Sequence, residues 1–198
     1  MNPEPLTESE KQTLLVLARQ SIELAVHKRP LPHLKLAEYS PALQADGASF
    51  VTLTIGGELR GCIGALEAYQ PLVQDVCEHA AAAAMEDYRF PPVRGVEVDK
   101  LEIEISRLTL PEPLVYNQPL ELLNKLRPGM DGVILRDGMR RATFLPQVWE
   151  KVPDTGDFLT HLCLKMGAPG NLWQRKMLQV LTYQVEEFRE ITKNKDLQ

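Results

Sequence analysis

The residues best suited to chemistry are a cysteine and an arginine in the stretch GELRGCIGALE, residues 57–67. Arg60 precedes Cys62 by two positions, which is roughly 6.6 Å between Cα atoms in a strand. A guanidinium at that distance stabilises a thiolate, the nucleophilic form of cysteine, and lowers the pKa of the thiol. Gly61 and Gly64 remove side chains around the sulfur, as expected where a ligand or another backbone comes close. The alternative is structural, because a free cysteine often fills a small gap in a core.

The sequence around this pair predicts a β-hairpin with a two-residue loop. FVTLTIGGELRGCI alternates in polarity on both sides of Gly56-Gly57. With that loop, Leu53 is expected opposite Arg60. Val51 is then expected opposite Cys62, so Arg60 and Cys62 would share one otherwise apolar face. An arginine on such a face requires a cleft or a buried carboxylate partner.

The remaining elements mix helices with hairpins. Helices are expected from a Thr7–Glu10 capping box to Pro30, from Pro71 to about Glu86, over Pro119–Leu126, from Asp154 or Thr155 to Gly167, and over Asn171–Met177. Strands are expected in LEIEISRLTL, in a hairpin around Asp137-Gly138 and in LTYQVEEF. Residues 30–49 should form an ordered loop, and RFPPVRG should be non-helical. Without regular βαβ alternation, the chain is expected to be α+β, with a mostly antiparallel sheet and packed helices.

The composition of the chain argues against some classes of function. The chain has 198 residues, a net charge of −5 and no long cluster of Lys and Arg, which argues against binding to nucleic acid. No apolar run is long enough to cross a membrane, and no basic patch is long enough to hold a membrane surface. Three cysteines, an odd number, favour a reduced, cytoplasmic location over a disulfide framework.

Partners for a catalytic cysteine are less evident. No metal or cofactor is expected, because Cys77 and His79, and likewise His161 and Cys163, are two apart on predicted helices and point to different sides. A nucleophilic cysteine needs a base, and the four histidines are weak candidates: His27, His33, His79 and His161. Glu102, Glu104 and Ser106 share one strand face, either as acid–base groups or, as we favour, on a solvated outer face.

Several motifs occur in one order along the chain: LRGCIG, RFPPV, LEIEISRL, DGVILRDGMRRATFLPQVWE and FLTHLCLKMGAPGNLW. This order resembles the AMMECR family, whose bacterial and archaeal members are called AmmeMemoRadiSam system protein A. The resemblance covers nearly all of residues 1–198 as a single AMMECR-type unit. It implies an α+β fold with two intertwined lobes and a cleft between them. It also implies a Memo-type protein and a radical SAM protein as companions, but it supplies no reaction.

The resemblance also implies site residues. The central motif is matched by Arg60, Gly61, Cys62, Ile63 and Gly64, and the second motif by Arg89, Phe90, Pro91 and Pro92. The family usually has DPRFPP where this chain has DYRFPP, so Tyr88 replaces a proline. The CxxxCxxC motif of radical SAM enzymes is absent, which makes this chain a companion of such an enzyme.

Two classes of function stay open. In the first, the protein is an enzyme or carrier that acts on a small molecule or modified group through Cys62 in the cleft, assisted by Arg60. In the second, it is a non-catalytic interaction or scaffold subunit, and the same surface docks another protein. The missing base and cofactor motif favour the second, whereas the polar pair on an apolar strand face favours the first.

Overall fold

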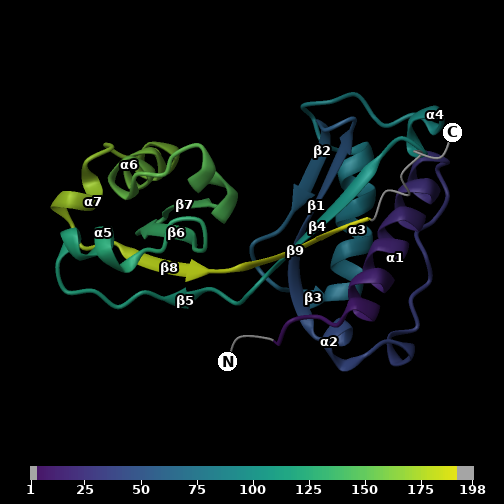
Figure 1. The fold of residues 1–198 in the computed structure, drawn as a ribbon, viewed down its shortest axis with the longest axis horizontal. Helices are drawn as coiled ribbons and strands as arrows, with labels where there is room; N and C mark the ends of the chain where they lie inside the picture. The colour runs from purple at the N-terminus through teal and green to yellow at the C-terminus, as the bar shows by residue number, and fades with distance from the viewer. Residues whose placement is uncertain (1–3, 191–198) are drawn as a thin grey trace, which may run out of the picture. The chain divides into compact units, whose positions relative to one another are not determined.

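A computed structural model describes residues 4–190 of the chain. The chain divides into two compact units, which Figure 1 shows. Of the described residues, 4–108 and 186–190 form unit 1, and Thr109–Val185 form unit 2, so unit 2 is inserted into the sequence of unit 1. Each unit has helices and an antiparallel sheet, which confirms the α+β class. The cleft expected between the lobes stays a prediction.

Unit 1 begins with a long capped helix, α1 (Glu8–Val26). The Thr7 hydroxyl accepts a hydrogen bond from the Glu10 amide at 3.3 Å, and the Glu10 carboxylate accepts one from the Thr7 amide at 2.8 Å. This is the predicted capping box. The helix ends before Lys28, which has a φ of 55°, so the basic residues at 27–29 follow the last turn and do not lie within it.

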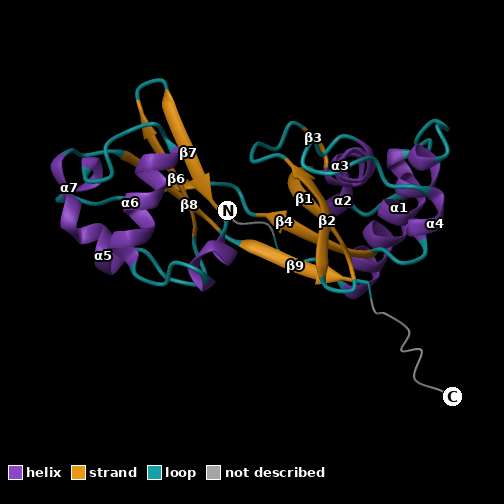
Figure 2. Cartoon of the chain, turned by 90° about the horizontal axis from the view of Figure 1, so that it is seen from above, coloured by secondary structure: helices purple, strands orange, loops and turns teal. Residues whose placement is uncertain are grey.

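The sheet of unit 1 has the strand order β2-β1-β4-β9, with β3 paired to β1 (Figure 2). Its strands are β1 (Asp46–Ile55), β2 (Glu58–Gly64), β3 (Gln70–Pro71), β4 (Glu102–Leu108) and β9 (Val185–Arg189). The other helical elements are η1 (Leu36–Glu38), α2 (Pro41–Gln44), α3 (Leu72–Met85) and α4 (Gly95–Val98). The loop predicted over 30–49 was wrong at its end, because Asp46 and Gly47 pair with β3.

The core of unit 1 lies between this sheet and helices α1 and α3. Val51 and Leu53 of β1 are fully buried in it. The alanine-rich helix α3 comes very close to β2. A Cβ atom on Gly61 would lie 2.1 Å from the carbonyl oxygen of Ala83, so only glycine fits there.

Unit 2 has its own sheet and its own core. Its strands have the order β5-β8-β6-β7: β5 (Glu112–Pro113), β8 (Gln179–Tyr183), β6 (Gly132–Asp137) and β7 (Arg140–Phe144). Its helical elements are η2 (Pro119–Glu121), α5 (Leu122–Lys125), η3 (Pro146–Glu150), α6 (Thr155–Lys165) and α7 (Leu172–Arg175). In the core, the rings of Trp149 and Phe158 stack with centroids 3.6 Å apart. The hairpin loop is Gly138-Met139, one residue later than predicted.

The predicted last strand, LTYQVEEF, is two strands in two sheets. β8 ends at Tyr183 in the sheet of unit 2, and β9 begins at Val185 and lies beside β4 in unit 1. Gln184 joins them: its amide donates to the Thr109 hydroxyl at 2.8 Å, and its carbonyl accepts from the Thr109 amide at 2.9 Å. Among the described residues, no helix combines the length and apolar character needed to cross a bilayer.

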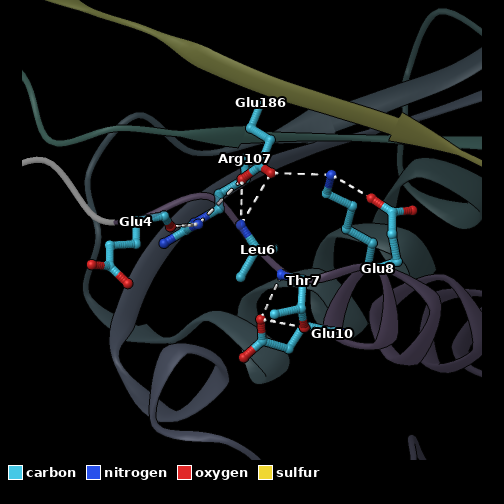
Figure 3. Close-up of polar contacts among 8 residues, drawn as sticks. Glu4, Leu6, Thr7, Glu8, Glu10, Arg107 and Glu186 are labelled. Carbon is cyan, nitrogen blue, oxygen red and sulfur yellow. Dashed lines mark hydrogen bonds and ion pairs between the residues drawn. The ribbon is translucent and has the colours of Figure 1, made fainter.

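One carboxylate fixes the returning chain to the start of unit 1, as Figure 3 shows. Glu186 accepts hydrogen bonds from the Leu6 amide at 3.1 Å and from the Arg107 guanidinium at 3.2 Å, and it forms an ion pair with Lys11 at 3.4 Å. Arg107 also donates to the carbonyl of Glu4 at 2.9 Å. The N-terminal segment, β4 and β9 therefore meet at a single side chain.

Candidate functional site

The β1–β2 hairpin has the predicted loop but not the predicted register. Thr54 pairs with Leu59, and the next pair is Leu53 with Gly61, so Arg60 is the extra residue of a β-bulge. The expected pairing of Leu53 with Arg60 was wrong. Its physical reason is the contact of Gly61 with α3: glycine must face the helix, and the bulge brings it there.

The bulge moves Cys62 onto the other face of the sheet. Cys62 pairs with Thr52, not with Val51 as expected. It therefore lies on the face turned away from α3 and from the core, because neighbouring residues of a strand alternate between faces. The thiol is half-buried, and the Thr52 hydroxyl donates a hydrogen bond to the sulfur at 3.3 Å.

An aromatic ring covers part of the same face. Phe50 pairs with Gly64, two residues after Cys62. A Cβ atom on Gly64 would lie 2.4 Å from the Phe50 ring, so the glycine of the motif makes room for that ring. The surface around the thiol thus combines the Thr52 hydroxyl with the Phe50 ring.

The backbone of Cys62 is hydrogen-bonded by an ion pair that consists of Asp87 and of Arg89, the first residue of the second motif. β2 is the edge strand of the sheet, so one side of it has no neighbouring strand. On that side the Cys62 amide donates to the Asp87 carboxylate at 2.8 Å, and the Cys62 carbonyl accepts from Arg89 at 3.2 Å. Asp87 and Arg89 also pair with each other at 2.6 Å, and this arginine holds the pKa of Asp87 well below its usual range. The pair occupies hydrogen-bonding groups that an edge strand normally leaves open.

Arg60 is paired with a carboxylate, and its hydrogen bonds within residues 4–190 do not include one to the thiol. Its guanidinium donates to Glu97 at 3.1 Å and to the carbonyl of Pro91 at 2.9 Å. Arg60, followed by the Arg94 amide, lowers the pKa of Glu97 to about 2. Of the two alternatives that the sequence raised for this arginine, the carboxylate partner is the one observed.

The second motif forms a tight turn beside β2. The Phe90 amide donates to the Asp87 carbonyl at 3.0 Å, and the Arg89 amide donates to the Asp87 carboxylate at 3.1 Å. Tyr88 is the second residue of this four-residue turn, a position that favours proline. The turn therefore forms although Tyr88 replaces the proline that the family usually has, and the Tyr88 side chain is 94% exposed.

The structure brings most of the predicted site residues together. Arg89 and Pro91 contact the first motif, and the Arg89 guanidinium lies 5.5 Å from the centroid of the Phe90 ring. Gly61, Ile63 and Gly64 flank Cys62 on β2, and Pro92 is exposed.

Sequence reasoning missed Asp87 and Glu97, the two acids that pair with the motif arginines. One signal was available. Glu97 follows Arg94 by three residues, the spacing of a helix capping box, and it accepts from the Arg94 amide at 2.9 Å.

Within residues 4–190, none of the four histidines forms a hydrogen bond with Cys62, as a general base would be expected to do. His79 is on α3, across the sheet from the thiol, and its Nδ1 atom lies 3.1 Å from the buried carboxylate of Asp75. The other three are exposed: His27, His33 and His161. Burial raises the pKa of both other cysteines, Cys77 and Cys163.

A carboxylate does share the face of the thiol. Glu104 of β4 pairs with Thr52, which pairs with Cys62, so the three residues form a row across β4, β1 and β2. Glu104 is half-buried and forms an ion pair with Arg189 at 3.4 Å. The expected solvated face holds for Glu102, which is exposed, but Ser106 is buried.

The fold and the site define an α+β protein with an inserted second unit and a braced cysteine on the edge strand of its first sheet. The AMMECR1 family model matches residues 15–188, and the chain belongs to that family. A protein of Methanothermobacter thermautotrophicus is 39% identical over 94% of this chain and 97% of its own length. Protein MJ0810 of Methanocaldococcus jannaschii is 42% identical over 68% of this chain and 67% of its own. The crystal structure of the uncharacterized protein PH0010 from Pyrococcus horikoshii superposes with a TM-score of 0.82 at 33% identity, covering 93% of both chains.

Proposed function

We propose that this AMMECR1-family protein is an enzyme or carrier that acts on a small molecule or modified group through the Cys62 thiol. The observation that carries the proposal is the placement of this thiol. It is half-buried on the outer face of the sheet, and the Thr52 hydroxyl donates to its sulfur at 3.3 Å. This hydrogen bond restrains the sulfur, and a nucleophile held in one position reacts more readily with a bound group. Cys77 and Cys163, in contrast, are buried in the cores.

The residues around Cys62 hold it in position and include a second group that could take part in a reaction, the carboxylate of Glu104. Asp87 and Arg89 fix both backbone groups of Cys62, so the thiol is held before any substrate arrives. Glu104 lies two strands away, roughly 9–10 Å between Cα atoms. A reacting group bound above Thr52 would have the thiol on one side and a carboxylate, a candidate general acid or base, on the other. Arg60 acts as a positioning residue through Glu97 and Pro91.

The proposed companions are a Memo-type protein and a radical SAM protein. Family resemblance supports them, since it implies that the three proteins occur together. The negative charge of the chain, −5, argues against nucleic acid as the partner. In such a system the thiol would receive a substrate group from a companion or present one to it.

A second function, protein docking at the same surface, is favoured by one observation. Tyr88 is 94% exposed although it sits between two residues that brace Cys62. An exposed tyrosine on a rigid turn is a common anchor of protein interfaces. The charges of Arg60 and Arg89 are already paired, which limits their use in catalysis.

Thiol alkylation distinguishes the two functions. With iodoacetamide between pH 5 and 9, Cys62 of the wild type should react before Cys77 and Cys163, as read by peptide mass spectrometry. Thr52→Val, which removes the donor and keeps the shape, should slow alkylation of Cys62 at neutral pH several-fold. If Cys62 reacts no faster than the buried cysteines, and capture of a companion from a native lysate depends on Tyr88, docking replaces chemistry as the function.

A further inference from the structure

A second polar row lies on the sheet of unit 2, away from Cys62. Arg136 of β6 pairs with Arg141 of β7 on one side and with Gln179 of β8 on the other. These three side chains therefore share one face. It is the face opposite the core, because Val133 and Leu135 of the same strand point into the core and strand residues alternate. All three side chains carry hydrogen-bond donors.

Arg136 lacks a partner among the described residues. Its Nε atom is buried and has no hydrogen-bond partner among residues 4–190. Arg141, in contrast, has an interaction of its own. A buried donor without an acceptor is costly, and this cost concerns the Nε atom of Arg136. The arrangement therefore has unfilled acceptor positions.

The nearest acid in the sequence does not fill them. Asp137 is the next residue of β6, so its side chain points to the other face. Its carboxylate is already bound by Lys176 at 2.6 Å and by Arg140. A negative partner for Arg136 is thus missing from the described part of the chain, although the protein as a whole carries a net charge of −5.

We propose that the row of Arg141, Arg136 and Gln179 binds the phosphate group of a ligand. Guanidinium groups match oxyanions, since each offers several N–H donors in a plane. Neighbouring side chains of the row are about 5 Å apart, so the donors converge from three strands. A tetrahedral phosphate can direct a separate oxygen to each of the three residues, whereas the two oxygens of a carboxylate lie in one plane and must be shared. The site is in unit 2 and does not depend on the function of Cys62.

Inorganic phosphate is the probe, and the Arg136 side chain is the reporter. In ¹⁵N-labelled protein, the Nε–H signal of Arg136 is identified by its loss in Arg136→Gln. At constant ionic strength, phosphate should shift this signal in the wild type with a saturable curve. Arg140→Gln removes the same charge from the same hairpin but from a paired arginine, so it should leave the curve unchanged. Thermal stabilisation by phosphate should require at least about tenfold more phosphate in Arg136→Gln.

The proposal would be overturned if the Nε–H shift of Arg136 did not saturate with phosphate in the wild type, or if acetate gave the same saturable shift. It would also be overturned if Arg140→Gln lost the phosphate-induced shift, or if phosphate stabilised Arg136→Gln as much as the wild type. Failure to fold is separable from failure to bind. Because Arg136→Gln removes a buried donor that has no acceptor, the variant should melt no lower than the wild type without phosphate. A lower melting temperature would mean that Arg136 is a structural residue, which also contradicts the proposal.

Discussion

The backbone amide of Cys62 donates a hydrogen bond to the carboxylate of Asp87 at 2.8 Å, across the open edge of β2. This bond links the two sequence motifs directly. Arg89 donates to the Cys62 carbonyl, so both backbone groups of Cys62 are hydrogen-bonded by the Asp87–Arg89 pair. With both groups engaged, no peptide can add to the sheet as a new strand at Cys62, so a partner must recognise side chains there.

The first prediction concerns the Asp87–Arg89 pair that holds the backbone of Cys62. Asp87→Asn should lower the free energy of unfolding at pH 7 by about 1–3 kcal/mol, because the nearly fully buried Asp87 carboxylate accepts from Arg89 and from the Cys62 amide, and an asparagine offers one oxygen and no charge. The native pKa of Asp87 is depressed below the unfolded value of about 3.9, so the stabilisation is complete above that value. It is lost as the pH falls through the native pKa. Urea unfolding at pH 7 and pH 3 should show the difference between wild type and variant shrinking in acid; a constant difference would contradict the charge-based account.

The second prediction concerns the glycine that precedes Cys62. Gly61→Ala should cost about 3 kcal/mol or more, because its Cβ would lie 2.1 Å from the Ala83 carbonyl oxygen, and backbone cannot yield cheaply. Gly95→Ala is the matched control, since a Cβ atom there would meet only the His27 ring at an ordinary 3.6 Å. Thermal melts measure both variants, and Gly61→Ala should have a much lower melting temperature than Gly95→Ala. Similar melting temperatures would mean that α3 does not approach β2 as described.

The third prediction concerns Arg60. Arg60→Gln should raise the pKa of Glu97 from about 2 by one unit or more, since Arg60 is the largest cause of the depression. Arg94→Gln should raise it less, because the Arg94 backbone amide still donates. Carboxyl ¹³C shifts followed against pH measure both values. The reverse order would assign the main role to Arg94.

The fourth prediction concerns Tyr88. Because it occupies the second position of the Asp87–Phe90 turn, Tyr88→Pro should stabilise the protein by about 0.4–1 kcal/mol through a more restricted unfolded chain. Tyr88→Ala serves as the control and should change little, since the side chain is exposed. Urea denaturation compares the two. A loss of stability in Tyr88→Pro would show that the Tyr88 backbone cannot adopt the proline conformation.

The sequence predicted what depends on neighbouring residues. The Thr7–Glu10 capping box and the Gly56-Gly57 loop are both present, because each is decided within a few residues. The register after the loop was not predictable in this way. It depends on the fit of Gly61 against Ala83, a contact between residues 22 positions apart.

The same distinction explains the other errors. LTYQVEEF alternates like one strand, and only the division of the chain into two sheets separates β8 from β9. Within the candidate site, the motif residues were predicted from sequence. Asp87 was missed because its role depends on a turn that places a carboxylate beside a distant strand.

The inserted arrangement of unit 2 has a consequence for the order of events during synthesis. Residues 109–185 are contiguous, so unit 2 can fold as soon as it leaves the ribosome. Unit 1 must wait, since β9 and Glu186 are made after unit 2. Until Glu186 reaches Arg107 and the Leu6 amide, the β4 edge of the first sheet stays uncovered. The nascent protein therefore holds its cysteine-bearing sheet incomplete until the whole of unit 2 and then β9 have been made.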